Sequence, residues 1–328
     1  MKVNSSACSQ ATQVSSPADV ADAPVAQEAQ ETTAAGGTER DAKLSTEKKS
    51  DIDLSGKLMA NQLSAKAQSS QNSSKTPAAQ EVEHAMEHAR ANGGGTREAI
   101  VAGAKADAGH VDVGSYSIQK GEDRLKEVYK TSGYSLEKNQ KYDRTGQPIV
   151  QLKEGKGSSS WCGVWATDIW KRAGCDVKWV AGQGPYDVKN KKSVPQVAVG
   201  GNNDKALQNV KPGDMIVINS YDANNPNKMK TGTTNHHAIV TDSVYEAGGK
   251  TITCPPAAVP QDGKLIGFHT MNGNSPGVPQ ADGSNPAIRE GYIDLTKKDV
   301  YTDDKDQKQY EKRISGYYPV PEPKTTSV

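Results

Sequence analysis

The sequence predicts an α+β fold for the second part of a 328-residue chain, behind a long polar arm. The aromatic residues are confined to that second part, because no Phe, Tyr or Trp occurs before Tyr116. There, one helix pattern with an apolar face is followed by several short segments with the alternation and turns of strands. A chain of about 200 residues is long enough for one well-buried domain. We therefore expect a single domain over residues 116–328.

Residues 1–115 form the polar arm and are rich in Ala, Ser, Thr, Gln, Glu and Lys. Such a composition cannot bury enough apolar surface to offset the loss of chain entropy, which predicts disorder. The stretch QEVEHAMEHARANGGG places Val82 and Met86 on one helical face. Because that stretch is so polar, we expect only a transient or partner-induced helix there.

The arm also bears on where the protein acts. Its first residues, MKVNSSACSQATQVSS, lack the apolar run of a secretory signal peptide, which predicts secretion or injection by a route without a cleavable signal. A long polar leader is a candidate region for recognition by secretion or injection machinery; a plain linker and an anchor to a phage or tail-like particle are the alternatives. The net charge of +1 and the interspersed charges disfavour a nucleic-acid partner. No apolar run approaches the roughly 18 residues of a membrane span.

Two helices are expected in the domain. The stretch SYSIQKGEDRLKEVYKTSG predicts a short strand and then a helix, with an inward face formed by Leu125, Val128 and Tyr129. In SSSWCGVWATDIWKRAGC the apolar residues recur at helical spacing. Ser159 or Ser160 is a candidate N-cap for this second helix, and Gly174 is expected to end it.

The strands are expected after these helices. In VKPGDMIVINS a Pro-Gly turn leads into a strand on which Met215 and Val217 share one face and the isoleucines the other. The stretch HHAIVTDSVYEAGGKTITC predicts a hairpin with strands over 236–245 and 250–254. Further strands are expected in GKLIGFHTMN and, at the sheet edge, in GYIDLTKKDV and RISGYYPV.

The residue types needed for nucleophilic catalysis occur in a suitable order. A thiol at a helix start, such as Cys162, faces unpaired N–H groups and the positive end of the helix dipole, which favour the thiolate and can later hold an oxyanion. A thiolate nucleophile also needs a histidine that a polar group orients. His236 or His237 and then Asn272 or Asn274 can supply these roles. The alternative without catalysis is that the cysteine is a core residue, the histidine a surface residue and the Asn-Gly-Asn stretch a turn.

Four stretches resemble one family in its own order. SWCGVWATDIWKRAG is similar to the nucleophile helix of CHAP amidases and peptidases, relatives of NlpC-type and papain-like cysteine hydrolases, which tend to show W-C-A-x-F-V there. VKPGDMIVI resembles their turn and strand, HHAIVTDSVYEAGGKTIT their histidine hairpin, and TMNGNS a strand end usually written E-G-N or G-G-N. These core motifs span residues 158–276. The resemblance implies a papain-like, CHAP-like domain whose nucleophile helix packs on an antiparallel sheet.

The resemblance also implies roles for single residues. Cys162 would be the nucleophile, and His236 the base, because Ala238 and the two residues after it then align with the family's A-I-V. His237 is the rival, since papain-like enzymes place their histidine directly before Ala. Adjacent strand residues face opposite ways, so we expect only one of the two histidines to face Cys162.

The third role and the substrate class stay open. Asn272 stands where many CHAP members have Glu, and Asn274 where an Asn is usual; either is a candidate to orient the imidazole. Long polar connections at 181–210 and 221–234 depart from compact members of the family.

The function implied by the resemblance is a cysteine-dependent amide hydrolase, namely a peptidoglycan amidase or endopeptidase that acts as a delivered effector, toxin or lysin. Peptidoglycan stem peptides would be its substrate, the periplasm or cell wall its site of action, and an immunity protein a further partner. No metal or organic cofactor is implied. The alternatives are a papain-like toxin that cleaves or deamidates a host protein, and an inactive binding module.

The remaining cysteines are expected to be structural or incidental. Cys175 lies beyond the helix end and Cys254 at a strand end, so buried free thiols are expected, with a Cys175–Cys254 disulfide as the alternative. Cys8 lies in the arm and is expected to be incidental.

Overall fold

The computed structural model of the chain describes residues 9–10, 75–113, 118–133, 149–152, 155–158, 161–180, 182–230, 235–254, 262–275, 284–304 and 306–321. Within these ranges four α-helices occur: α2 (Pro77–Ala91), α3 (Thr96–Ala106), α4 (Glu122–Thr131) and α5 (Trp161–Arg172). A 3₁₀ helix, η1, spans Lys205–Asn209.

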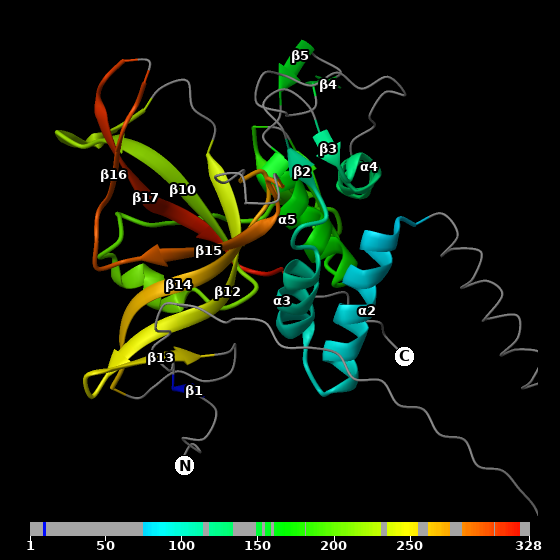
Figure 1. The fold of residues 1–328 in the computed structure, drawn as a ribbon, viewed down its shortest axis with the longest axis horizontal. Helices are drawn as coiled ribbons and strands as arrows, with labels where there is room; N and C mark the ends of the chain where they lie inside the picture. Colours follow the sequence, from blue (N-terminus) through cyan, green and yellow to red (C-terminus); the bar gives the residue numbers. More distant parts are fainter. Residues whose placement is uncertain are drawn as a thin grey trace, which may run out of the picture. The chain divides into compact units, whose positions relative to one another are not determined.

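Ten strands within the described ranges form one antiparallel sheet. They are β1 (Ser9–Gln10), β9 (Val197–Ala198), β10 (Met215–Asp222), β11 (Asn225–Met229), β12 (His236–Ala247), β13 (Lys250–Cys254), β14 (Lys264–Asn272), β15 (Arg289–Asp294), β16 (Asp299–Thr302) and β17 (Gln309–Tyr318). The main path runs β1-β13-β12-β10-β17-β16 (Figure 1). Besides this path, β14 pairs with β12 and β15, β11 with β10, and β9 with β17.

Three smaller sheets complete the described strands. They are β2 (Asp112–Val113) with β3 (Ile118–Lys120), β4 (Ile149–Leu152) with β5 (Gly155–Ser158), and β6 (Val177–Val180), β7 (Gly184–Asp187) and β8 (Lys192–Ser193) in that order.

The central strand β10 is covered on both faces. Met215 and Val217 belong to the apolar cluster that contains the tryptophans of α5, whereas Ile216 belongs to a second cluster with Phe268 and Ile314. The alternation expected for this strand is therefore confirmed. Because successive side chains point to opposite faces, one short strand joins two separate cores.

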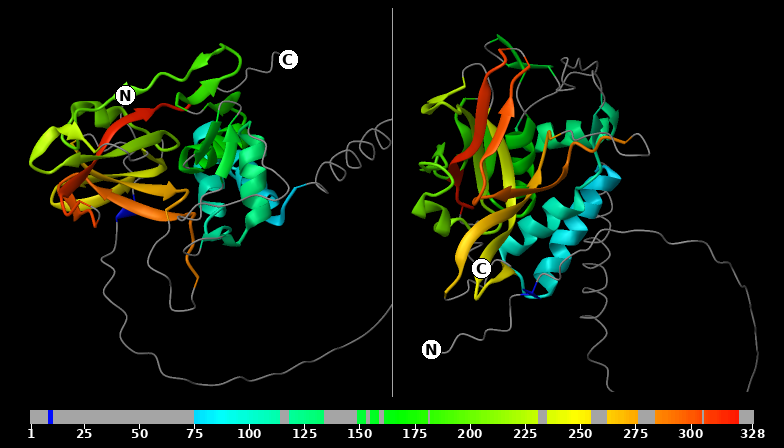
Figure 2. Two further views of the ribbon diagram at one scale, coloured as in Figure 1. Left: turned by 90° about the horizontal axis from the view of Figure 1, so that it is seen from above. Right: turned by 60° about the vertical axis from the view of Figure 1, so that its left-hand side comes forward.

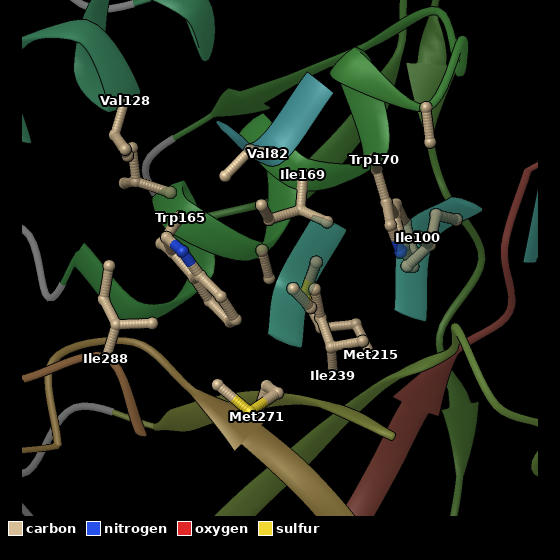
Figure 3. Packing of buried hydrophobic residues seen from close by; sticks show 14 of the residues in the cluster. Val82, Ile100, Val128, Trp165, Ile169, Trp170, Met215, Ile239, Met271 and Ile288 are labelled. Carbon is tan, nitrogen blue, oxygen red and sulfur yellow. The ribbon is translucent and has the colours of Figure 1, made fainter. Parts of the chain in front are cut away.

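Helix α5 packs on the first of these faces. Trp165 and Ile169 lie over Ile239 and Met271 of the sheet (Figure 3), and α5 also contacts α3 and α4. The indole Nε1 of Trp170 donates a hydrogen bond of 2.8 Å to the carbonyl oxygen of Gly213. Each large apolar side chain buried here contributes roughly 1.5–3 kcal/mol, so α5 is firmly placed against the sheet.

The expected fold class, α+β of the papain-like or CHAP-like kind, is wrong. The described residues form a sheet-rich structure built around a large antiparallel sheet of many strands. The difference arises in the two connections expected to be polar loops. The first, 181–210, contains β7, β8, β9 and η1, and the second, 221–234, contains β11, whose five side chains are all exposed. Main-chain hydrogen bonds pair such strands without an apolar pattern.

The expected boundary of the arm at residue 115 also differs from the structure. Pro77–Ala106 forms α2 and α3, and Val82, Met86 and Ile100 are fully buried in the cluster of α5. The two helices lie on the α5 side of the sheet in both views (Figures 1 and 2). The aliphatic residues of α2 and α3 are sufficient to bury these helices, because they share one apolar cluster with the tryptophans of α5. The disorder expected for the rest of the arm concerns residues 1–8 and 11–74, which lie outside the described residues.

The other expected elements are confirmed, with one exception. The helix at 122–131 buries Leu125, Val128 and Tyr129, and the hairpin turn is made by Gly248 and Gly249, with φ of 57° and 71°. Such positive φ values favour glycine. The exception is β17, which was expected at an edge but pairs with β10, β16 and β9.

Candidate active site

Cys162 is the second residue of α5 and is fully buried. The helix ends as expected: Gly174 has φ of 97°, and the N–H of Cys175 donates to the carbonyl oxygen of Trp170 at 3.0 Å. This pattern is a left-handed C-cap, which glycine adopts without strain. The expected N-caps, Ser159 and Ser160, lie outside the described residues.

The first residues of β12 surround the sulfur of Cys162. The backbone N–H of His237 donates to Sγ at 3.3 Å, and Sγ lies 3.7 Å from the carbonyl oxygen of Asn235. The ring Nδ1 of His237 lies 3.6 Å from the same sulfur. The thiol is also hydrogen-bonded with His236. Both histidines therefore interact with Cys162.

The expectation that only one histidine can face Cys162 is wrong. It rested on the alternation of side chains across a strand. The sulfur instead lies at the end of β12, because it contacts the backbone of Asn235, before the strand, and of His237, its second residue. A group at the strand end is within reach of side chains from both faces.

Asn272 holds the imidazole of His236. Nε2 of His236 lies 2.9 Å from Oδ1 of Asn272. The amide nitrogen of Asn272 donates to Oγ1 of Thr270 at 3.0 Å and to the carbonyl oxygen of Arg289 at 3.5 Å. Because the amide nitrogen is engaged there, Oδ1 is the atom that faces His236, and Nε2 carries a proton. Nδ1 of His236 is then the ring nitrogen that remains to accept a proton.

Asn274, the other candidate for this role, lies past the end of β14. Its φ is 52°, in the left-handed region, and it lines the same pocket as His236 and Asn272. The hydrogen bond that orients His236 is instead the one that its Nε2–H donates to Oδ1 of Asn272.

The electrostatics of the site favour a thiolate beside an imidazolium. Burial on its own would raise the pKa of the Cys162 thiol, but hydrogen bonds and charge from His236 and His237 outweigh it and hold that pKa well below its ordinary value. For His236, burial would lower the pKa, yet the hydrogen bonds to Cys162 and Asn272 and the Cys162 charge raise it. The two groups titrate as a coupled pair, so the charged form occupies the window between the two shifted pKa values.

Aromatic groups that the sequence did not single out enclose His237. The ring of Trp179 meets it edge-on, with centroids 5.1 Å apart, and Tyr318 stacks at 6.4 Å. Trp179 approaches because Gly163, next to Cys162, has no side chain: a Cβ there would lie 2.1 Å from the indole. A glycine in the first turn of an otherwise apolar helix is the signal that could have found this contact.

Cys175 and Cys254 differ from each other and from Cys162. Cys175 is a buried free thiol, and burial raises its pKa to about 12. Cys254 is disulfide-bonded, so the alternative of a Cys175–Cys254 disulfide is wrong, and so is the expectation of a free thiol at 254. Cys8 lies outside the described residues.

Two further observations concern ligands and membranes. Within the described ranges, no group of three or more His, Cys, Asp or Glu side chains is arranged to hold a metal ion. Nor does that part of the chain contain a helix with the length and apolar character needed to cross a membrane.

The reactivity of Cys162 should follow its lowered pKa. The thiolate is the reacting form, so iodoacetamide alkylation of Cys162 should persist well below pH 8.5, where an ordinary thiol is half ionised. Replacing His236 or His237 by alanine should move the midpoint of the rate–pH curve upward, because hydrogen bonds and charge from both histidines lower the pKa of the thiol. Peptide mass spectrometry against pH measures both curves. Equal midpoints for Cys162 and Cys175 would contradict this expectation.

No family model, no curated protein and no solved structure matches this chain. The site is therefore interpreted from its own geometry.

Proposed function

We propose that the protein is a cysteine-dependent amide hydrolase. The observation that carries this proposal is the chain of contacts from Cys162 to His236 to Asn272, in which a thiol, an imidazole and an orienting amide follow one another. This is the arrangement that a thiol nucleophile requires. The pKa of Cys162 is lowered and that of His236 is raised, which adds support, because perturbed titratable groups cluster at functional sites.

The reaction uses these three residues in turn. The Cys162 thiolate attacks the amide carbonyl carbon, and backbone N–H groups at the start of α5 stabilise the oxyanion. The His236 imidazolium gives its proton to the leaving nitrogen as the C–N bond breaks, which leaves a thioester on Cys162. His236 then takes a proton from water, the hydroxide attacks the thioester, and the C–S bond breaks to release the acid and restore the thiolate. Asn272 keeps the imidazole in position throughout.

Peptidoglycan is the substrate that we propose, with amidase or endopeptidase activity. The support is the similarity of SWCGVWATDIWKRAG and HHAIVTDSVYEAGGKTIT to the nucleophile helix and histidine hairpin of CHAP enzymes. The disulfide at Cys254 supports action outside a reducing cytosol, since disulfides persist in oxidising compartments. A delivered effector, toxin or lysin fits both features.

Purified bacterial sacculi provide the test. The full-length protein should release soluble muropeptides, identified by mass spectrometry, and the same protein alkylated at Cys162 should release none. The mass of each product shows whether an amide at the glycan–peptide junction or one within the stem peptide was cleaved. Absence of released products, with a folded protein and a reactive Cys162, would rule out the wall-hydrolase proposal and favour a protein substrate.

A further inference from the structure

A pocket of about 560 Å³ opens beside His236 on the face of the sheet away from α5. Its wall includes His236, Asn272 and Ile218, and Ile218 is the direct cross-strand partner of His236 on β10. Met215 and Val217 of β10 point instead to the cluster of α5. Cys162 and His237 are buried, whereas His236 is partly exposed, so a substrate in this pocket meets the site through His236.

A second pocket of about 810 Å³ lies next to this one. The two share a wall made by Asn202, Lys297, Lys298 and Arg313. Together they form an extended groove that begins at His236, and we call it the His236 groove. The two volumes together exceed the roughly 300–1,000 Å³ of a typical small-molecule pocket, which favours a larger ligand such as a peptide segment.

The His236 groove carries an excess of positive charge at its catalytic end. The first pocket is lined by five Lys and Arg side chains and by three Asp and Glu side chains. Lys297 pairs with Asp294 at 3.2 Å, Lys312 lies 4.0 Å from Asp299, and Arg313 lies 3.8 Å from Glu311. Arg289 and Lys298 form no ion pair with the described residues. Among the carboxylates that line the pocket, Glu290 likewise forms no ion pair with the described residues.

We propose that the His236 groove binds an acidic peptide segment of the substrate, with Arg289 and Lys298 contacting its carboxylates. This proposal rests on the proposed amide hydrolase function and names the class of substrate that the site accepts. Carboxylates are favoured because guanidinium and ammonium groups donate charge-assisted hydrogen bonds to them. A peptide is favoured over a nucleic acid because the groove starts at a group positioned to act on an amide.

The electrostatics of His236 connect the groove to the chemistry. The positive charge of Lys312 acts to lower the pKa of His236, against the larger effects that raise it. A bound carboxylate near Lys312 offsets that charge and so strengthens the imidazolium. An acidic segment would therefore assist the protonation of the leaving nitrogen as well as hold the substrate.

Binding without turnover provides the test. In the full-length Cys162→Ala protein, fluorescein-labelled hexaglutamate should bind by fluorescence anisotropy, and hexaglutamine and a dT6 oligonucleotide should bind more weakly. Adding Arg289→Gln with Lys298→Gln should weaken hexaglutamate binding about tenfold, since two charge contacts are lost. The matched control replaces Lys130 and Lys189, two exposed lysines outside the groove, by Gln and should leave binding unchanged.

A second measurement separates the groove from unspecific attraction. NMR titration of the His236 imidazole in the same protein should show a higher pKa with hexaglutamate bound. Equal loss of binding in the control, preferential binding of the oligonucleotide, or an unmoved His236 pKa would each overturn the proposal. Because no turnover is involved, these results stand whether or not sacculi are cleaved, and sacculus cleavage without hexaglutamate binding would overturn the groove alone.

Discussion

Replacing Cys162 by alanine is expected to abolish hydrolysis in the sacculus assay. The sulfur is the atom that forms the thioester, so its removal eliminates the covalent route and not merely a proton transfer worth about 10²–10⁴-fold. Release of muropeptides over time, quantified by mass spectrometry, measures the effect. Thermal unfolding should change little by comparison, since the thiol is small.

Cys175→Ala is the matched control for that substitution. Cys175 is also a buried free cysteine, lying beyond the C-terminal end of α5, but burial raises its pKa and no histidine lowers it. This variant should retain the activity of the original protein. Full activity in Cys162→Ala, or an equal loss in both variants, would show that Cys162 is a packing residue.

Arg124→Met should cause the largest loss of stability. Arg124 is only 1% exposed and pairs with Asp107 at 2.6 Å and with Asp168 at 2.8 Å, both fully buried. Methionine fills the space but removes the cation paired with Asp107, and it leaves Asp168 paired with Arg172 at 3.0 Å. Removing one partner of a buried pair costs about 3–5 kcal/mol, which urea unfolding followed by circular dichroism measures.

Lys126→Met on the same helix is the control for Arg124. Lys126 pairs with Glu122 at 2.8 Å one turn away, but both side chains are partly exposed, Lys126 by 35% and Glu122 by 45%. Exposed pairs of this kind contribute about 0.3–0.5 kcal/mol, so the variant should unfold almost as the original protein does. A loss for Arg124→Met no greater than for Lys126→Met would contradict the structural role given to the buried pair.

Local patterns account for what the sequence predicted well. The helix around Cys162, the strand at Met215 and the hairpin at Gly248 each follow from the periodicity and turn chemistry of fewer than about 20 residues. The order Cys162, His236, Asn272 could also be read from the sequence, because it depends only on residue types and their order along the chain. These are features that a short segment specifies by itself.

The remaining features depend on contacts between distant segments. Helix α2 looked too polar to pack, yet Val82 and Met86 are buried because α5 offers an aromatic partner. The helix-start signal at Thr76 and Pro77 was readable: the Thr76 side chain caps the N–H of Ala79 at 3.2 Å. That both histidines interact with Cys162 could not be predicted, because it depends on where α5 crosses the end of β12.

The charged side chains between the helices have a practical consequence for fragment design. Asp107 at the end of α3 and Glu83 on α2 pair with Arg124 of α4 and Arg172 of α5. A recombinant piece that begins at Tyr116, where the aromatic residues start, would lack both acids and would leave two arginines without part of their counter-charge. A piece that keeps these helices together therefore begins at or before Lys75, and one that keeps the whole sheet must also retain β1, which pairs with β13.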